Sequence, residues 1–208
     1  MKLSIALANT KPGTSKTTSS VMLAYALHGA GHDVLLADTD PAASALEWSD
    51  AIGGFPFDVI GLSAQNPGTK LSAYAGSDTV VIVDTPQAED HGRTVRSILR
   101  VVDELVIPVA PSTIEVERTS AMAEVIGEAE ENRERPVRTS LLLTRVVASA
   151  RSGPEVREAL HGAGYDVLTS EIPRWETYSM AYGAAPEKSA LPPFEKLGNE
   201  LLERAGAA

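Results

Sequence analysis

The chain has 208 residues, which is enough for one domain with a sizeable hydrophobic core. It contains no cysteine, and this excludes disulfides, iron–sulfur clusters, thiolate zinc sites and thiol nucleophiles. The formal net charge of -10 argues against a protein that coats nucleic acid through overall charge, so any DNA binding would need a local basic surface.

Short apolar runs alternate with segments of helical periodicity, which is typical of an α/β domain with a mostly parallel twisted sheet and helices on both faces. The predicted strands lie near 3–8, 34–38, 58–62, 80–84, 104–109, 138–144 and 167–172. The run 80–83 is β-branched without polar alternation, so we expect it inside the sheet and buried on both faces. The clearest predicted helices are 16–28, 113–131, 153–161 and 194–204. No linker interrupts this order, and we expect a single domain over 1–208.

Residues 9–18, NTKPGTSKTT, follow the first predicted strand and lead directly into the first predicted helix. This is the context of a phosphate-binding loop, because free N–H groups and the positive end of the helix dipole favour an anion there. We expect Lys16 to contact the β- and γ-phosphates, Thr17 to ligate Mg²⁺ and Thr18 to bond the α-phosphate. A Ser/Thr-rich helix cap would have a similar sequence, so the loop alone leaves both interpretations open.

Three carboxylates follow predicted strands. Asp38 and Asp40 come at the end of one strand, and Asp84 ends another. The carboxyl ends of parallel strands share one edge of a sheet, so these side chains should converge near the loop after the first strand. Carboxylates beside a phosphate need a cation, and we expect Mg²⁺ held through Thr17 and, by way of water, Asp84. The alternative is that each aspartate only caps the next element.

The ordered motifs resemble those of the ParA/MinD family of deviant-Walker P-loop ATPases. Residues 11–18 resemble the family's K-G-G-x-G-K-[ST]-[ST] loop, residues 38–41 its D-x-D-P motif and residues 83–86 its metal-binding strand end. Further resemblance extends over 105–111, 142–145 and 172–174. It therefore covers nearly the whole chain.

The resemblance implies a P-loop NTPase fold, ATP or ADP with Mg²⁺ as cofactors, and roles for particular residues. Lys11 is the signature lysine, which would act in trans on the phosphates of a partner across an ATP-sandwich dimer. Asp40 corresponds to the aspartate that positions the attacking water, and Asp38 helps to hold the loop and the metal. The implied catalytic residues are Lys11, Lys16 and Asp40. The implied nucleotide-binding residues are Lys11, Gly13, Thr14, Ser15, Lys16, Thr17 and Thr18 in the loop, and Thr144, Arg145, Pro173 and Arg174 in the segments that enclose adenine.

Three residues depart from the family pattern. Pro12 replaces a glycine, lacks an N–H group and pushes Lys11 toward an extended conformation. Ser15 replaces another glycine, and a positive φ there would cost serine about 1–2 kcal/mol. Ala42 stands where the family often has glutamine. Nucleotide binding is therefore better supported than fast hydrolysis.

Absences narrow the resemblance to the short ParA type. The lack of cysteine excludes reductases that bridge an iron–sulfur cluster. The segment 194–204 is net acidic, unlike a basic membrane helix, and we expect no membrane partner. We expect no helix-turn-helix extension before the first strand. The short ParA type forms an ATP-dependent homodimer, binds DNA non-specifically and responds to a small centromere-binding or adaptor protein, so we expect a cytoplasmic, nucleoid-associated protein.

DNA binding would require a basic face. The two candidate clusters are Arg93, Arg96 and Arg100, and Arg133, Arg135 and Arg138. Solvated helix faces explain such clusters at least as well.

Two function classes remain open. The first is an ATP-hydrolysing dimerisation switch for DNA partition or cargo positioning. The second is a nucleotide-binding regulatory or scaffold protein in which Pro12 and Ser15 have reduced hydrolysis. A metabolic ATP-dependent ligase of the dethiobiotin-synthetase kind is a more distant third, and it would not need Lys11.

Overall fold

A single parallel sheet organises the computed structural model, which describes residues 1–64, 66–131 and 133–206, apart from the side chains of 116–118. The strand order is β3-β2-β4-β1-β5-β6-β7, and each strand pair is parallel. The strands are β1 Leu3–Leu7, β2 Val34–Asp38, β3 Asp58–Gly61, β4 Val80–Asp84, β5 Glu104–Val109, β6 Arg138–Val146 and β7 Val167–Pro173. The predicted α/β fold and strand positions are confirmed.

Strand β4 lies between β2 and β1, and all of its residues are buried. This is the interior position expected of its β-branched sequence. Register places Asp84 opposite Leu7 of β1 on one side and opposite Asp38 of β2 on the other. The ends of three neighbouring strands therefore reach the same edge of the sheet.

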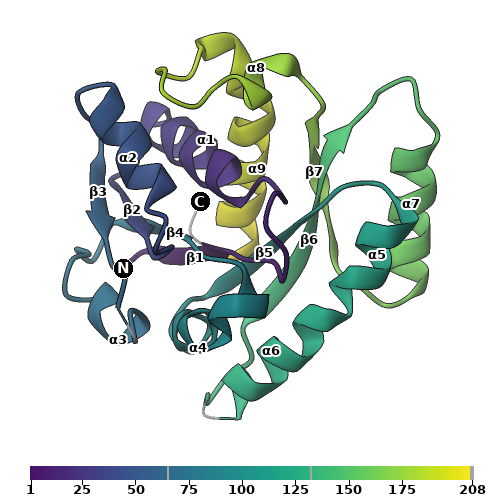
Figure 1. Ribbon diagram of the computed structural model, residues 1–208, viewed down its shortest axis with the longest axis horizontal. Coiled ribbons are helices and arrows are strands. Elements are labelled where there is room, and N and C mark those ends of the chain that lie inside the picture. Colours follow the sequence, from purple (N-terminus) through teal and green to yellow (C-terminus); the bar gives the residue numbers. More distant parts are fainter. Residues whose placement is uncertain (65, 132, 207–208) are drawn as a thin grey trace.

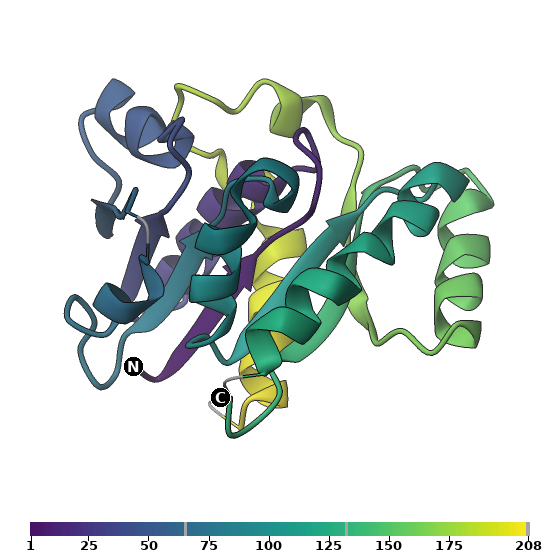
Figure 2. The same cartoon turned by 60° about the horizontal axis from the view of Figure 1, so that its bottom comes forward.

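Helices cover both faces of the sheet (Figures 1 and 2). On one face, the core is formed with α1 Lys16–Gly29, α2 Ser44–Ala51 and α9 Pro192–Arg204. On the other face it is formed with α3 Gly68–Leu71, α4 Ala88–Leu99, α6 Ala121–Glu130 and α7 Ser152–Gly162. Within the described residues, no helix is both long enough and apolar enough to cross a bilayer.

Two features of the helices differ from the sequence expectation. The predicted helix 113–131 is two helices, α5 Thr113–Thr119 and α6, which separate at Ser120. Helix α2 has no clear start signal in its own sequence. It is capped instead by Asp38, at the end of β2. The Oδ2 atom of Asp38 accepts the N–H groups of Ala45 at 2.8 Å and Leu46 at 3.1 Å. This helix is therefore fixed by a tertiary contact.

Candidate functional site

The loop between β1 and α1 contains two left-handed residues. Gly13 has φ +70°, and Ser15, which precedes α1, has φ +69°. Ser15 therefore adopts the conformation that favours glycine, and its hydroxyl makes no capping bond to the helix that follows. The serine substitution carries the backbone cost anticipated for a positive φ.

Lys16 is held inside the site. Its side chain is buried, with 7% of the residue exposed, and Nζ donates a hydrogen bond to the carbonyl oxygen of Lys11 at 3.1 Å. Burial lowers the pKa of this ammonium group, while the charges of Asp84 and Asp40 act in the opposite direction. A bound anion would supply the counter-charge that burial makes favourable.

Lys11 has a partner on its own chain. Its Nζ forms an ion pair with Glu89 of α4 at 2.5 Å, and the side chains are 36% and 50% exposed. The expected role in trans on a partner's phosphates remains a prediction. It would require this lysine to leave Glu89.

Asp38 and Asp40 have different environments. Besides the two bonds of its Oδ2 atom to α2, Asp38 accepts the N–H group of Asp40 through Oδ1 at 3.1 Å. Its carboxylate is therefore already engaged by backbone groups, although its role at the metal remains a prediction. Asp40 accepts the N–H group of Ala42 at 2.9 Å and lines the main cavity.

Asp84 is fully buried and retains an unpartnered oxygen. Its Oδ1 atom accepts a hydrogen bond from Ser20 at 3.1 Å, whereas Oδ2 has no partner among the described residues. Burial raises the pKa of this carboxyl group to about 7, although the Thr17 hydroxyl acts to lower it. An orphaned carboxylate oxygen beside a threonine hydroxyl fits a divalent cation.

Mg²⁺ would still need ligands beyond the side chains of Thr17 and Asp84. Among the residues that the structure describes, no three acidic or histidine side chains form a ready-made metal cluster. Such a cation is usually held by one or two protein ligands together with phosphate oxygens and water. Thr17 and Asp84 can supply this protein share.

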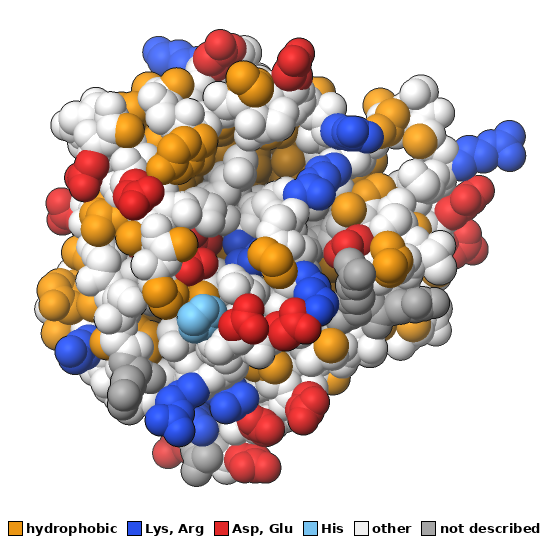
Figure 3. Space-filling view, in the orientation of Figure 1, with side chains coloured by type: hydrophobic (Ala, Val, Ile, Leu, Met, Phe, Trp, Pro, Cys, Tyr) orange, Lys and Arg blue, Asp and Glu red, His pale blue; other side chains and the backbone are white. Residues whose placement is uncertain are grey.

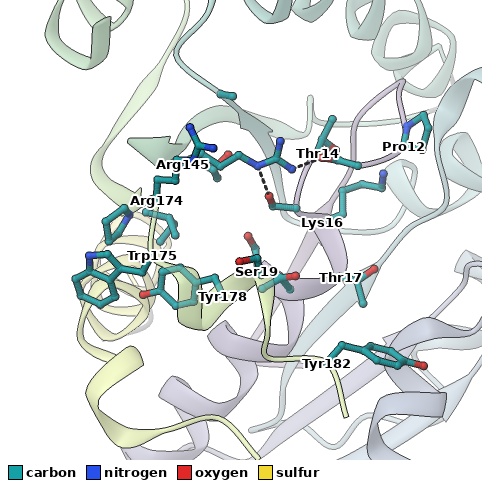
Figure 4. Close-up of a pocket in the computed structure, with 18 of the residues that line it drawn as sticks. Pro12, Thr14, Lys16, Thr17, Ser19, Arg145, Arg174, Trp175, Tyr178 and Tyr182 are labelled. Atoms are coloured by element: carbon teal, nitrogen blue, oxygen red, sulfur yellow. Dashed lines mark hydrogen bonds between the residues drawn. The ribbon is translucent and has the colours of Figure 1, made fainter. Parts of the chain in front are cut away.

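A cavity of about 910 Å³ lies along the phosphate loop (Figure 4). Its wall contains the expected residues Gly13, Thr14, Ser15, Lys16, Thr17, Thr18, Asp40, Thr144, Arg145, Pro173 and Arg174. Lys11, Asp38 and Asp84 are outside this wall. In Figure 3, Lys and Arg side chains border the hollow near the centre of the face. The structure therefore brings the loop residues and the residues expected around adenine together along one cavity.

Aromatic side chains form a part of the wall that the sequence motifs did not indicate. Trp175 and Tyr178 stack with ring centroids 5.5 Å apart at 17°. The Tyr178 hydroxyl donates to the carbonyl oxygen of Ala190 at 2.8 Å, and burial raises its pKa to about 12. The W-x-x-Y spacing directly after Pro173 and Arg174 is the signal that could have revealed this wall.

The segment 174–190, here called the strap, is attached to α2. The Tyr182 hydroxyl donates to Glu47 Oε2 at 3.2 Å, and Trp48 Nε1 donates to the carbonyl oxygen of Ala184 at 2.8 Å. Helix α8, Glu176–Ser179, and the 3₁₀ helix η1, Lys188–Ala190, belong to this strap. The strap follows β7 and is joined by these hydrogen bonds to α2, the helix that follows Asp38 and Asp40.

Residues 5–184 match the family model described as the CobQ/CobB/MinD/ParA nucleotide-binding domain. The chain belongs to this family. The resemblance inferred from its motifs is therefore confirmed.

The similarity of this CobQ/CobB/MinD/ParA domain to a curated relative extends along most of its length. It is 32% identical over 194 residues to the maintenance of carboxysome distribution protein A of Gloeobacter kilaueensis. The alignment covers 90% of this chain and 80% of the relative.

Solved structures share the fold at lower identity. MinD of Pyrococcus horikoshii OT3 with Mg-ADP has a TM-score of 0.70 and 20% identity, covering 100% of this chain and 99% of that chain. Cobyrinic acid a,c-diamide synthase of Mycobacterium smegmatis with ADP and magnesium has a TM-score of 0.77 and 18% identity, covering 98% and 95%. ATP or ADP with Mg²⁺ as cofactors is consistent with these structures.

Some arginines of the two clusters make contacts within the chain of this family member. Arg96 pairs with Glu128 at 2.8 Å, and Arg138 pairs with Glu104 at 2.7 Å. Arg133 donates to the carbonyl oxygen of Leu99. These contacts support the interpretation that part of each cluster is structural.

Proposed function

We propose that this protein is a Mg-ATP-dependent dimerisation switch that partitions DNA or positions a cargo over the nucleoid, with slow ATP hydrolysis. We further propose that residues 1–208 act as one ATPase domain. The observation that carries the proposal is the combination, at one edge of the sheet, of a phosphate loop preceded by Lys11 with Asp40 in the cavity wall. The carboxysome-distribution relative supports a positioning role.

The proposed chemistry relies on positioning and charge. In this scheme the loop N–H groups and Lys16 bind the phosphates, while Thr17 and Asp84 hold Mg²⁺, which would neutralise the developing phosphate charge. Asp40 would orient the attacking water from the cavity wall. Thr144, Pro173 and Arg174 would enclose the base at the other end of the cavity.

Dimerisation would use Lys11. This lysine would exchange its ion pair with Glu89 for phosphate oxygens bound by the partner, so that ATP would join two protomers more strongly than ADP does. A small adaptor or centromere-binding protein and non-specific DNA are the partners proposed for the dimer.

The first test is the molar mass in solution, measured by light scattering with Mg-ATP and with Mg-ADP at matched protein concentration. The expected result is a dimer with ATP and a monomer with ADP. Lys11→Ala should abolish both the dimer and ATP turnover while nucleotide still binds. Lys70→Ala, which changes an exposed lysine of α3, is the matched control and should alter neither. Unchanged turnover in Lys11→Ala would contradict the switch.

A nucleotide-binding regulatory or scaffold protein is the second candidate. It is favoured by the left-handed conformation of Ser15 and by the missing N–H group of Pro12. A monomer that retains nucleotide in both states, with little turnover, would support this candidate. An ATP-dependent ligase is the third, and it predicts that Lys11→Ala leaves activity intact.

A further inference from the structure

We propose that Arg145 positions the phosphate loop, and that Ser15 and Arg145 act as a pair in which the arginine holds the serine in its left-handed conformation. This role differs from the expected contact of Arg145 with adenine. It rests on the proposed nucleotide-binding function, because the loop is taken to bind phosphate.

Two hydrogen bonds connect Arg145 to the loop. Its Nε atom donates to Ser15 Oγ at 3.2 Å, and its Nη2 atom donates to the carbonyl oxygen of Gly13. Figure 4 shows these bonds as dashed lines that converge on the guanidinium group, while Arg174 lies apart from the loop. The arginine thus contacts both residues of the loop that have positive φ.

The side chain of Ser15 explains why such a contact is useful. A glycine would adopt φ +69° without strain, whereas serine carries a Cβ atom that disfavours this conformation. The hydroxyl group is available to Arg145 because it makes no bond to α1. Compared with glycine, serine at this position has a strained backbone, but its hydroxyl group can accept a hydrogen bond.

The backbone of Arg145 is arranged to make this contact. Arg145 itself has φ +57°, and it lies where the pairing of β6 with β7 shifts register between Leu143 and Val146. Such irregularities commonly redirect a side chain at the end of a strand. Here the side chain points to a loop that is 130 residues away in sequence from Arg145.

The guanidinium group of Arg145 keeps free N–H donors after it has bonded the loop. It has five N–H donors, so two bonds to the loop leave donors for a phosphate oxygen. The phosphate end of the cavity would then have one cation from α1, Lys16, and one from β6. A loop held from both sides keeps its N–H groups aligned before nucleotide arrives, which lowers the cost of binding.

The first test needs no nucleotide. Hydrogen exchange of the amides of residues 13–17 is compared in the unaltered protein, Arg145→Lys and Arg174→Lys. Lysine keeps the charge but lacks the planar guanidinium whose separate donors bond Ser15 and Gly13. The expected result is exchange at least about threefold faster in Arg145→Lys and unchanged in Arg174→Lys. Equal exchange in all three proteins would overturn the proposal.

The second test is a double-mutant cycle on the dissociation constant for Mg-ATP, measured by calorimetry. Arg145→Lys should weaken binding about tenfold when residue 15 is serine, and by less than about threefold in the Ser15→Gly background. Arg174→Lys should have the same effect in both backgrounds. A tenfold loss from Arg145→Lys in both backgrounds would show that its effect on binding does not depend on Ser15, which would contradict the pairing.

These two tests distinguish a failure of this inference from a failure of the proposed nucleotide-binding function. If the unaltered protein bound no nucleotide, the proposed function would fail, and the exchange measurement would still decide whether Arg145 holds the loop.

Discussion

Lys11 is held by an acidic residue of its own chain, and this contact competes with any contact across a dimer. An exposed ion pair contributes about 0.2–1 kcal/mol, and a symmetric dimer would break two of them. We expect Glu89→Gln to strengthen ATP-dependent dimerisation by about two- to thirtyfold, measured by light scattering over a dilution series. Asp90→Asn, which changes the same charge on the same helix, should have little effect. An equal change in both variants would assign the effect to net charge.

Burial of the Asp84 carboxylate lowers the stability of the fold at neutral pH. Its raised pKa means that the folded chain binds this proton more tightly than the unfolded chain does. Its contribution to stability is therefore full below the ordinary pKa of 3.8 and is lost as the pH rises through about 7.

Asp84→Asn removes this charge. At pH 8, without nucleotide or Mg²⁺, the variant should unfold with a free energy about 1–3 kcal/mol higher than that of the unaltered protein. In denaturant titrations this advantage should disappear toward pH 4. The exposed Asp78→Asn is the control, and a pH-independent difference for Asp84→Asn would contradict the explanation from burial.

Motifs and the family resemblance predicted residues that the structure brings together along one cavity, but they did not predict the contacts between distant elements. The loop from Gly13 to Thr18 and the aspartates at strand ends follow from motif and strand order. The contacts of Lys11 with Glu89 and of Ser15 with Arg145 do not, because each joins residues of distant elements. Spacing contains no information on such pairs.

Helix α2 depends on the carboxylate that ends β2. We expect Asp38→Asn to lower the free energy of unfolding by about 1–3 kcal/mol without nucleotide or Mg²⁺. An asparagine offers one acceptor oxygen, and its amide group would face the N–H group of Asp40 or the N–H groups of α2. Chemical denaturation measures this loss.

The two aspartate substitutions form an internal comparison. Asp38 and Asp84 occupy paired positions on adjacent strands, and burial raises the pKa of both carboxyl groups. Their asparagine variants should still change stability in opposite directions, because Asp38 accepts three backbone N–H groups that an asparagine cannot all satisfy. If Asp38→Asn affected only Mg²⁺ binding, the helix-capping role would be contradicted.

The elements of the sheet were predictable because burial on both faces leaves a continuous apolar run in each interior strand. The helices were less so. The break between α5 and α6 leaves the apolar periodicity of 113–131 intact. Helices α2 and α8 are short: the first is capped by Asp38, and the second lies within the strap. Tertiary contacts override weak local preferences in such segments.

The whole molecule is acidic, so DNA binding by the proposed dimer would depend on the arginines that internal contacts leave exposed. Arg93 of α4 is exposed, and so is Arg100, which directly follows this helix. Replacing both with alanine should weaken DNA binding and reduce the salt slope by about 2 for each protomer in contact. Fluorescence anisotropy with Mg-ATP at several salt concentrations measures both effects. Arg151→Ala is the control, and unchanged binding in the double variant would place DNA on another surface.

The strap and α2 bring both tryptophans of the chain, Trp48 and Trp175, into the wall of the same cavity. Trp48 is buried and Trp175 is 44% exposed, so the two indoles differ in their contact with water. The unlabelled protein therefore has an optical reporter of its own: a ligand that covers Trp175 should shift its emission to shorter wavelength. Such a signal follows the arrival and departure of a ligand in real time, with a Trp175→Phe variant as the silent reference.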